Sequence, residues 1–209
     1  MQIVMAWVGR QVSYILVAMR VIAGSLRRRT LDAPPGLDTR PTSDRLRETL
    51  FNVLAPRVEG ARFLDLYAGS GAVGIEAISR GAALAVLVER AVPALRVLRN
   101  NLDKVGLGRE IRVEAANAAA YLRRAGSENS SFDFDIVFLD PPYDAAKEYA
   151  LALGLLGGEA AKLLRNEAVV VAEHRRKQKL EIDYGTLTRT RLLEQGDTAL
   201  SFYQSTSRR

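Results

Sequence analysis

The chain contains no cysteine and a single histidine in 209 residues. The lack of cysteine excludes disulfides, thiol catalysis and cysteine-ligated zinc or iron–sulfur centres. His174 alone cannot form a histidine metal site, and its place directly after the segment Val169–Glu173 is typical of a strand end rather than of a catalytic base. We therefore expect a site without metal, built from carboxylates, backbone groups and aromatic rings.

Long hydrophobic runs are also missing. A helix that crosses a bilayer needs about 20 consecutive apolar residues, and the apolar segments within residues 1–18 are interrupted by Arg10, Gln11 and Ser13. No basic region precedes these segments and no small-residue cleavage site follows them, as a secretion signal would require. We interpret residues 1–18 as a non-essential extension, with an extra strand or an interfacial segment as the alternative. A cytoplasmic location without a membrane partner is expected.

Positive charge is in excess, with a net charge of +6 at neutral pH. Such an excess suits a polyanionic partner, but it is equally compatible with ordinary solvated surface. The length of the chain is sufficient for one α/β domain with a small appendage and is short for two domains. We expect a monomer.

From residue 61 onward, short apolar runs alternate with segments of helical periodicity. Such alternation indicates a parallel sheet with right-handed helical crossovers. The tail, residues 179–191 and 199–204, has the pattern of an antiparallel pair joined at Gly196-Asp197. We therefore predict an α/β fold in which residues 61–205 form a seven-stranded, mostly parallel, Rossmann-like sheet with an antiparallel C-terminal edge. The expected strands before the tail are 63–67, 84–88, 111–116, 134–139 and 168–172, and the expected helices are 73–78, 92–105, 118–124 and 149–164, the last broken near Gly157-Gly158.

Residues 19–60 are predicted to form a small basic subregion in front of this domain. Residues 20–31 suit a strand or hairpin that carries Arg27, Arg28 and Arg29, and Arg40 follows in a loop. These side chains are candidates for contact with a polyanion, and solvated surface is the alternative reading.

A helix is predicted after this loop, with Asp44 favourably placed in its first turn. Its apolar residues fall on one stripe, which must pack against the rest of the protein. Arg45 and Arg47 lie off that stripe, and we expect both to face outward. The stripe consists of Leu46, Leu50, Val53 and Leu54.

Asp140-Pro141-Pro142-Tyr143 directly follows the apolar run 134–139 and is expected at the carboxyl end of a buried strand, where open α/β sheets bind ligands. The two prolines fix φ and remove two backbone donors, which leaves a stiff turn of hydrogen-bond acceptors. The Asp140 carboxylate and a backbone carbonyl can each accept one N–H of a ring amine, and Tyr143 can stack on the ring. This arrangement suits the presentation of an exocyclic amine, although Asp and Pro are also ordinary turn residues.

Gly69 and Gly71 lie between a predicted strand and a predicted helix, where backbone can approach a ligand closely. Glu89 follows 20 residues after Gly69, at the end of the next strand, and an acid there can accept hydrogen bonds from both ribose hydroxyls of a nucleoside cofactor. Asp65 is costly to bury without a partner, so it is expected to orient the glycine loop or a ligand amine. Asn117 can contact an adenine edge or cap a helix, and Glu89 can be an incidental charge at a strand end.

The glycine pattern by itself does not separate two kinds of enzyme, because Gly74 supplies the third glycine that a dinucleotide dehydrogenase usually has. A hydride-transfer site has no need of a rigid acceptor turn with a stacking ring, whereas methyl transfer to a ring amine does. A sulfonium methyl is already activated, so alignment and electrostatics suffice. The turn at Asp140 therefore favours methyl transfer.

These motifs resemble those of class I S-adenosylmethionine-dependent amino-methyltransferases, which share the glycine loop from Asp65 to Gly71, the acid Glu89 and the turn Asp140–Tyr143. The stretch Arg40–Asn52, with Arg20–Gly24 ahead of it, is similar to the N-terminal signature of the bacterial small-subunit 16S ribosomal RNA guanine-N2 methyltransferases. The resemblance covers about residues 19–203 and leaves out residues 1–18.

The resemblance implies the class I methyltransferase fold, S-adenosylmethionine as cofactor and methylation of a guanine N2 in 16S rRNA of the assembled or assembling small subunit. Base extrusion would cost a few kcal/mol. The implied cofactor-binding residues are Asp65, Tyr67, Gly69, Ser70, Gly71, Glu89 and Asn117. The implied base-binding and catalytic residues are Asp140, Pro141, Pro142 and Tyr143, and those implied to face RNA phosphates are Arg27, Arg28, Arg29, Arg40, Arg45 and Arg47.

Two alternatives stay open at the level of sequence. The Asp140–Tyr143 turn also suits amino-methylation of adenine or cytosine in DNA or in another RNA, although 209 residues leave little room for a DNA-reading domain. A non-catalytic RNA-binding assembly factor with the same fold is the second alternative.

Overall fold

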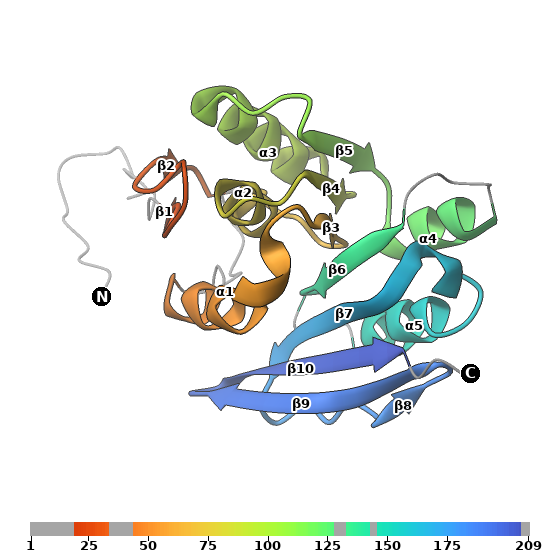
Figure 1. The fold of residues 1–209 in the computed structure, drawn as a ribbon. Helices are drawn as coiled ribbons and strands as arrows, with labels where there is room; N and C mark the ends of the chain where they lie inside the picture. The colour runs from red at the N-terminus through yellow and green to blue at the C-terminus, as the bar shows by residue number, and fades with distance from the viewer. Residues whose placement is uncertain (1–18, 34–43, 128–132, 143–145, 206–209) are drawn as a thin grey trace, which may run out of the picture.

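A computed structural model describes residues 19–33, 44–127, 133–142 and 146–205 of the protein (Figure 1). Its centre is an eight-stranded sheet in the order β5-β4-β3-β6-β7-β10-β9-β8. Five neighbouring strands are parallel, as the alternation of apolar runs and helices predicts. These are β3 (Arg62–Asp65), β4 (Leu84–Glu89), β5 (Ile111–Ala115), β6 (Phe134–Leu139) and β7 (Leu164–Arg175).

The C-terminal edge of the sheet is antiparallel, and it has one strand more than predicted. β10 (Thr198–Ser205) lies between β7 and β9 (Leu187–Gln195) and is antiparallel to both. The additional strand is the short β8 (Asp183–Tyr184), which pairs with β9 and raises the count from seven to eight. Gly157 directly follows the helix α5 (Ala146–Leu156) and lies against β8. A Cβ added at Gly157 would be 1.7 Å from the carbonyl oxygen of Tyr184. Glycine at this position therefore permits the close approach of β8.

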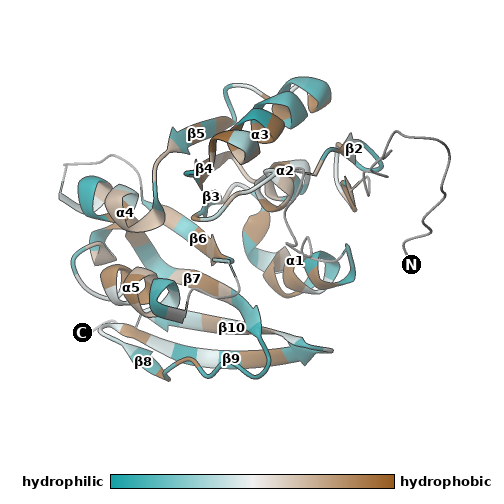
Figure 2. Ribbon diagram, turned by 180° about the vertical axis from the view of Figure 1, so that it is seen from behind, coloured by the Kyte–Doolittle hydropathy of each residue, from teal (hydrophilic) through white to brown (hydrophobic). Residues whose placement is uncertain are grey.

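Helices cover both faces of the sheet (Figure 1). α1 (Asp44–Val58), α2 (Ala72–Ser79) and α3 (Val92–Val105) contribute to one buried cluster, and α4 (Ala118–Ser127) and α5 (Ala146–Leu156) to the other. Hydrophobic and hydrophilic residues alternate along α1, α3 and α5 (Figure 2), as expected for helices that bury one face. A single-turn 3-10 helix (Ala161–Leu163) precedes β7.

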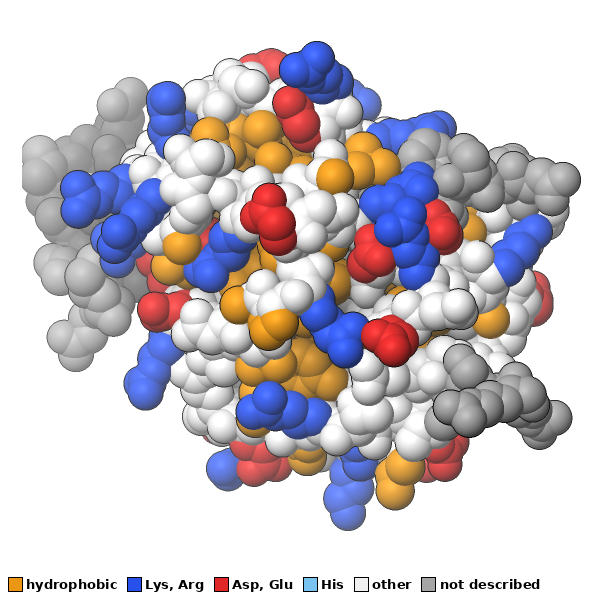
Figure 3. Space-filling model, viewed as in Figure 1, with side chains coloured by type: hydrophobic (Ala, Val, Ile, Leu, Met, Phe, Trp, Pro, Cys, Tyr) orange, Lys and Arg blue, Asp and Glu red, His pale blue; other side chains and the backbone are white. Residues whose placement is uncertain are grey.

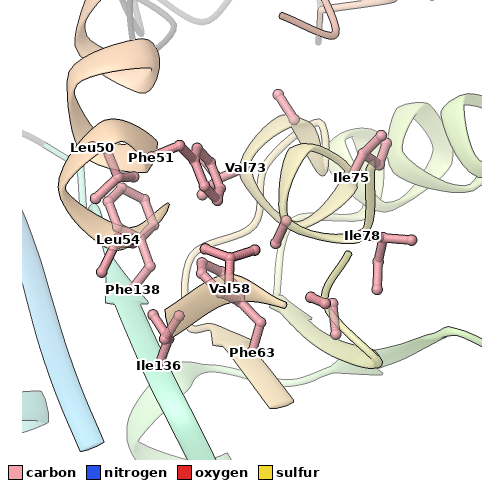
Figure 4. Close-up of a cluster of buried hydrophobic side chains, with 14 of the residues drawn as sticks. Leu50, Phe51, Leu54, Val58, Phe63, Val73, Ile75, Ile78, Ile136 and Phe138 are labelled. Carbon is pink, nitrogen blue, oxygen red and sulfur yellow. The ribbon is translucent and has the colours of Figure 1, made fainter. Parts of the chain in front are cut away.

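The N-terminal subregion shares its core with the rest of the protein. Leu50, Phe51 and Leu54 of α1 pack beside Phe63 of β3 and Phe138 of β6 (Figure 4). The two-stranded hairpin of β1 (Met19–Arg20) and β2 (Thr30–Leu31) buries apolar side chains in the same cluster. The hairpin predicted from the sequence is therefore present, and it is docked against α2.

Arg47 is the clearest departure from the sequence prediction. The side chain was expected to face outward, but it is 1% exposed and points into the interface between α1, α2 and the hairpin. Its guanidinium donates to the carbonyl oxygen of Arg20 and to Asp44 Oδ1 at 3.0 Å, and its Nε lies 3.8 Å from Glu76 Oε2. Burial lowers the pKa of Arg47. The prediction was wrong because the buried face of α1 is wider than the predicted stripe and also includes Arg47, Phe51 and Val58.

Within the described ranges, no helix has the combination of length and apolar character that spanning a bilayer requires.

Candidate functional site

Three carboxylates lie at the carboxyl ends of neighbouring parallel strands. In the sheet, Asp65 of β3 pairs with Phe138 of β6, which pairs with Val171 of β7. Asp140 and Glu173 each lie two residues beyond those partners, so all three carboxylates project from the same face of the sheet. That is the face covered by α1 and α2. The predicted turn at Asp140 and the predicted glycine loop after Asp65 therefore lie on adjacent strands.

Burial and the charges of neighbouring carboxylates disfavour the charged forms of Asp65 and Asp140. Asp65 is 2% exposed, and its burial, with contributions from Glu89 and Glu173, raises its pKa to about 7. The backbone N–H of Tyr67 donates to Asp65 Oδ1 at 3.3 Å and acts in the opposite direction. Asp140 is half-buried, and desolvation followed by the charges of Glu173 and Asp65 raises its pKa well above the ordinary value. A cation placed at this edge would be stabilised by the same acids.

Glu89 holds the glycine loop against the end of β4. Its Oε2 accepts the backbone N–H of Gly69 at 2.8 Å, and its Oε1 accepts those of Arg90 at 2.8 Å and Ala91 at 2.7 Å. The sequence assigned this acid to ribose hydroxyls. In the structure it also fixes the loop, and a carboxylate has lone pairs left for further donors.

Glycine is present at three positions in or near this loop for different structural reasons. Gly69 has φ +54° and no atom within 4 Å of the position of an added Cβ, so open space lies in front of it. Gly71 has φ +82° and is the N-cap residue of α2. An added Cβ at Gly74 would lie 2.2 Å from Leu87 Cδ2 of β4. Gly74 is thus required for close packing of α2 on the sheet, and its presence carries no information about the type of cofactor.

The other predicted cofactor residues already have partners within the protein. The Tyr67 hydroxyl donates to Glu148 Oε2 of α5 at 2.9 Å, and burial is the main cause of its raised pKa. Asn117 is exposed at the carboxyl end of β5 and caps α4, because its Oδ1 accepts the backbone N–H of Ala120 at 2.7 Å. Ser70 is 9% exposed, and its carbonyl oxygen accepts a hydrogen bond from Asn101.

After β6, Asp140 is half-buried, Pro141 is buried and Pro142 is exposed, so the chain reaches the surface within this turn. Tyr143 and Arg40 lie outside the described residues. His174, by contrast, is buried inside β7, where its Nε2 is 2.9 Å from Ser201 Oγ. Burial lowers the pKa of His174, in line with a structural rather than a catalytic role. Among the described residues there is no group of three or more His, Asp or Glu side chains placed to hold a metal ion.

The predicted RNA-facing arginines are not gathered at the site. Arg27, Arg28 and Arg29 are exposed on the turn of the hairpin, whose Ser25 N–H donates to the carbonyl of Ser79 at the last turn of α2. α2 begins at the glycine loop, so this turn lies about 12 Å along the helix from that loop. Arg45 is exposed near the start of α1. Basic side chains are dispersed over the surface seen in Figure 3 and do not form one large patch there.

Asn101 of α3 was missed in the sequence and connects the glycine loop to the N-terminal subregion. It is fully buried, and its Nδ2 donates to the carbonyl oxygens of Ser70 at 2.9 Å and Asp32 at 3.0 Å. Its Oδ1 accepts the backbone N–H of Asp32 at 2.8 Å. A polar residue on the buried stripe of a helix was the available sequence signal, because such a residue needs partners.

Replacing Asn101 by alanine should destabilise the protein by about 2 kcal/mol, because the buried carbonyl of Ser70 and the half-buried backbone of Asp32 would lose their partner. Urea denaturation measures the loss. Asn100→Ala is the matched control, since Asn100 is the neighbouring residue on α3 and is exposed. Equal stability of the two variants would show that the Asn101 hydrogen bonds contribute little.

Comparisons with known proteins agree on one family for this chain. The family described as "Conserved hypothetical protein 95" matches residues 19–204. YlbH of Bacillus subtilis is 38% identical over 186 residues, which are 89% of this chain and 98% of YlbH. Ribosomal RNA small subunit methyltransferase D of Escherichia coli K12 is 44% identical over 125 residues, 60% of each chain.

Solved structures support the fold. The structure of Escherichia coli yhhF matches with a TM-score of 0.76 and 34% identity over 90% of this chain and 98% of yhhF. The ribosomal protein L11 methylase of Lactobacillus delbrueckii has a TM-score of 0.64 at 14% identity and covers 83% of each chain. The second likeness concerns the fold alone, and it confirms the class I methyltransferase fold predicted from the sequence.

Proposed function

The chain belongs to the Conserved hypothetical protein 95 family, and from this premise we propose that it transfers a methyl group from S-adenosylmethionine to the exocyclic N2 amine of a guanine in 16S rRNA of the small ribosomal subunit. Escherichia coli methyltransferase D, whose name specifies small-subunit rRNA, supports the substrate class. The turn at Asp140 supports an amine as the acceptor.

The described residues fit this cofactor. The glycine loop has open space in front of Gly69, where a ligand can approach the backbone. Two carboxylates flank this loop, the buried Asp65 before it and Glu89 at the end of β4. Asp65, Gly69, Glu89 and Asn117 would hold the cofactor, which supplies a methyl group on a positively charged sulfonium. Asp65, whose pKa is raised to about 7 by burial, would gain from the positive charge of this ligand.

The acceptor amine would be held by the turn after β6. The Asp140 carboxylate accepts one N–H and the carbonyl of Pro141 accepts the other, which orients the nitrogen lone pair toward the methyl group. As the new N–C bond forms, the methyl–sulfur bond would break and its electron pair would stay on sulfur, which would leave as the neutral thioether of S-adenosylhomocysteine. The ionised Asp140 would stabilise the positive charge that develops on the nitrogen and could take the proton that the nitrogen loses. Tyr143 would stack on the extruded base. Asp140 must be ionised for this role, and its pKa is raised in the protein without ligands.

The observation that carries the proposal is the adjacency of two features. Asp140 ends β6, and β6 is the direct neighbour of β3, whose carboxyl end carries Asp65 and the glycine loop. An acceptor turn and a nucleoside-binding loop on neighbouring strands place two substrates side by side, as group transfer requires.

A labelled-methyl assay with three substrates tests the proposal. Purified protein and tritiated S-adenosylmethionine are incubated with small subunits lacking the modification, with naked 16S rRNA and with duplex DNA. We expect label in the small-subunit RNA, and digestion followed by mass spectrometry should identify N2-methylguanosine. Label in DNA alone, or a methylated base other than guanine, would overturn the proposed substrate. Absence of label in all three would favour the non-catalytic assembly factor.

A further inference from the structure

The turn that follows β7 is a basic segment with no role in the site described above. Its sequence is Arg175-Arg176-Lys177-Gln178-Lys179, and all four basic residues are exposed. The turn is closed by a hydrogen bond from the Gln178 N–H to the carbonyl of Arg175 at 2.9 Å. Four positive charges are thus held on a short ordered segment.

This basic turn (175–179) lies at the same edge of the sheet as Asp140. Leu139 of β6 pairs with Ala172 of β7, so Glu173 is level with Asp140 on the neighbouring strand. Arg175 is two residues further along β7, which places it about 7 Å beyond that level at the rise of an extended strand. The turn therefore projects past the proposed base-binding residues, at the rim of the site.

Arg45 approaches the same rim from α1. The Thr49 hydroxyl oxygen lies 3.0 Å from the carbonyl oxygen of Arg45 and 3.0 Å from Gln195 Oε1, which places the first turns of α1 beside the end of β9. Thr198 of β10 pairs with both Gln195 and Arg175. Arg45 and the basic turn thus flank the β9–β10 turn, and the Arg176 N–H donates to the carbonyl of Asp197 there at 2.8 Å.

The charges of Arg176, Lys177 and Lys179 are available for an external partner. None of the ion pairs formed among the described residues includes Arg176, Lys177 or Lys179. Basic residues that are not neutralised within the protein gain most from phosphate contacts, because each contact releases condensed counterions. The hairpin arginines, by contrast, lie at the far end of α2.

We propose that the basic turn 175–179, together with Arg45, binds the RNA backbone phosphates next to the nucleotide held at Asp140. This inference rests on the proposed function, since it assumes that RNA is the substrate. Contacts of this kind fix the position of the strand and carry no sequence information. They would direct the target base toward the turn after β6.

Charge reversal at the turn tests this inference in the full-length protein. The test variant is Lys177→Glu/Lys179→Glu. The matched control is Arg109→Glu/Arg123→Glu, which changes the net charge equally at two exposed residues, one before the start of β5 and one on α4. Binding of a small-subunit rRNA fragment is measured by filter binding at several salt concentrations, and binding of S-adenosylmethionine by calorimetry checks that both variants are folded.

We expect the test variant to bind RNA about tenfold more weakly, and the slope of log affinity against log salt to shrink by about 1.4 for two lost single-strand contacts. The control should retain a near wild-type slope. Equal losses in both variants would assign the effect to net charge, and an unchanged slope in the test variant would remove the turn from the interface. Either result overturns the inference. The proposed function is tested separately, by measuring methyl transfer from the wild-type protein to small subunits.

Discussion

Asp140→Asn should lower the rate of methyl transfer by a factor of about 10² to 10³, which is the usual cost of removing one group that stabilises charge developing in a transition state. Asparagine keeps the shape of the side chain but loses the negative charge beside the acceptor nitrogen. Binding of S-adenosylmethionine should remain close to that of the wild type. Single-turnover transfer to small subunits, together with calorimetry of cofactor binding, separates the two effects.

Asp133→Asn is the matched control for this variant. Asp133 precedes β6 and lies at the opposite end of the strand from Asp140, where it pairs with Arg62 Nη1 at 2.7 Å and Arg165 Nε at 3.0 Å. These pairs are partly exposed, so their loss should cost at most about 1 kcal/mol and leave the transfer rate nearly unchanged. A wild-type rate in Asp140→Asn would exclude Asp140 from the chemistry.

The pH dependence of the methyl-transfer rate provides a second test of the role of the Asp140 carboxylate. Burial, Glu173 and Asp65 raise the pKa of this carboxyl, so a larger fraction is protonated at a given pH than for a free aspartate. The protonated form cannot serve as the anionic acceptor, and the wild-type rate should therefore increase as the pH rises through that pKa. The residual activity of Asp140→Asn should lack this increase.

Glu76→Leu should destabilise the protein by about 3–5 kcal/mol, the range expected when one partner of a buried ion pair is removed. The Glu76 carboxylate is fully buried and accepts the backbone N–H groups of Ile22 at 2.8 Å and Ala23 at 3.0 Å, as well as Arg80 Nε at 2.7 Å. Arg47 Nε lies 3.8 Å from Glu76 Oε2. The substitution would leave these donors without their acceptor and loosen the hairpin from α2.

Thermal or urea unfolding measures this loss. Glu48→Leu serves as the control, because Glu48 is exposed on α1 and surface substitutions usually change stability by less than about 0.5 kcal/mol. Glu76→Gln keeps the shape and part of the hydrogen bonding and should fall between the two. If Glu76→Leu were as stable as the control, the buried network would not stabilise the docking of the hairpin.

The parallel part of the fold was predictable because its signals are local. β6 was predicted as 134–139 and α3 as 92–105, and both are found with these bounds. Buried parallel strands need continuous apolar runs, and the helices between them need one apolar face. The predicted resemblance to small-subunit rRNA methyltransferases is likewise confirmed by the family match over residues 19–204 and by the similarity to YlbH and methyltransferase D, whereas guanine N2 as the acceptor stays a prediction.

The roles of charged residues were less predictable, because an arginine or a glutamate has the same local signature whether it is solvated or paired in the interior. Arg47 was assigned to RNA and is buried against Glu76 and Asp44. The sequence analysis did not predict a role for the basic turn 175–179, because its position beside Asp140 depends on the register of β7 with β6. Asn101 contacts segments 31 and 69 residues away in the chain.

The sequence by itself determined the α/β architecture and the positions of the glycine loop and of the turn at Asp140, because each depends on residues that are close together in the chain. The tertiary structure alone decided that Asp65, Asp140 and Glu173 share one face at one edge, since strand order and register set the distances between them. It also decided which arginines are buried in the interface and which lie at the rim of the site. The physical reason is that burial, and with it the pKa of a carboxyl or the availability of a cation, depends on neighbours brought together only by folding.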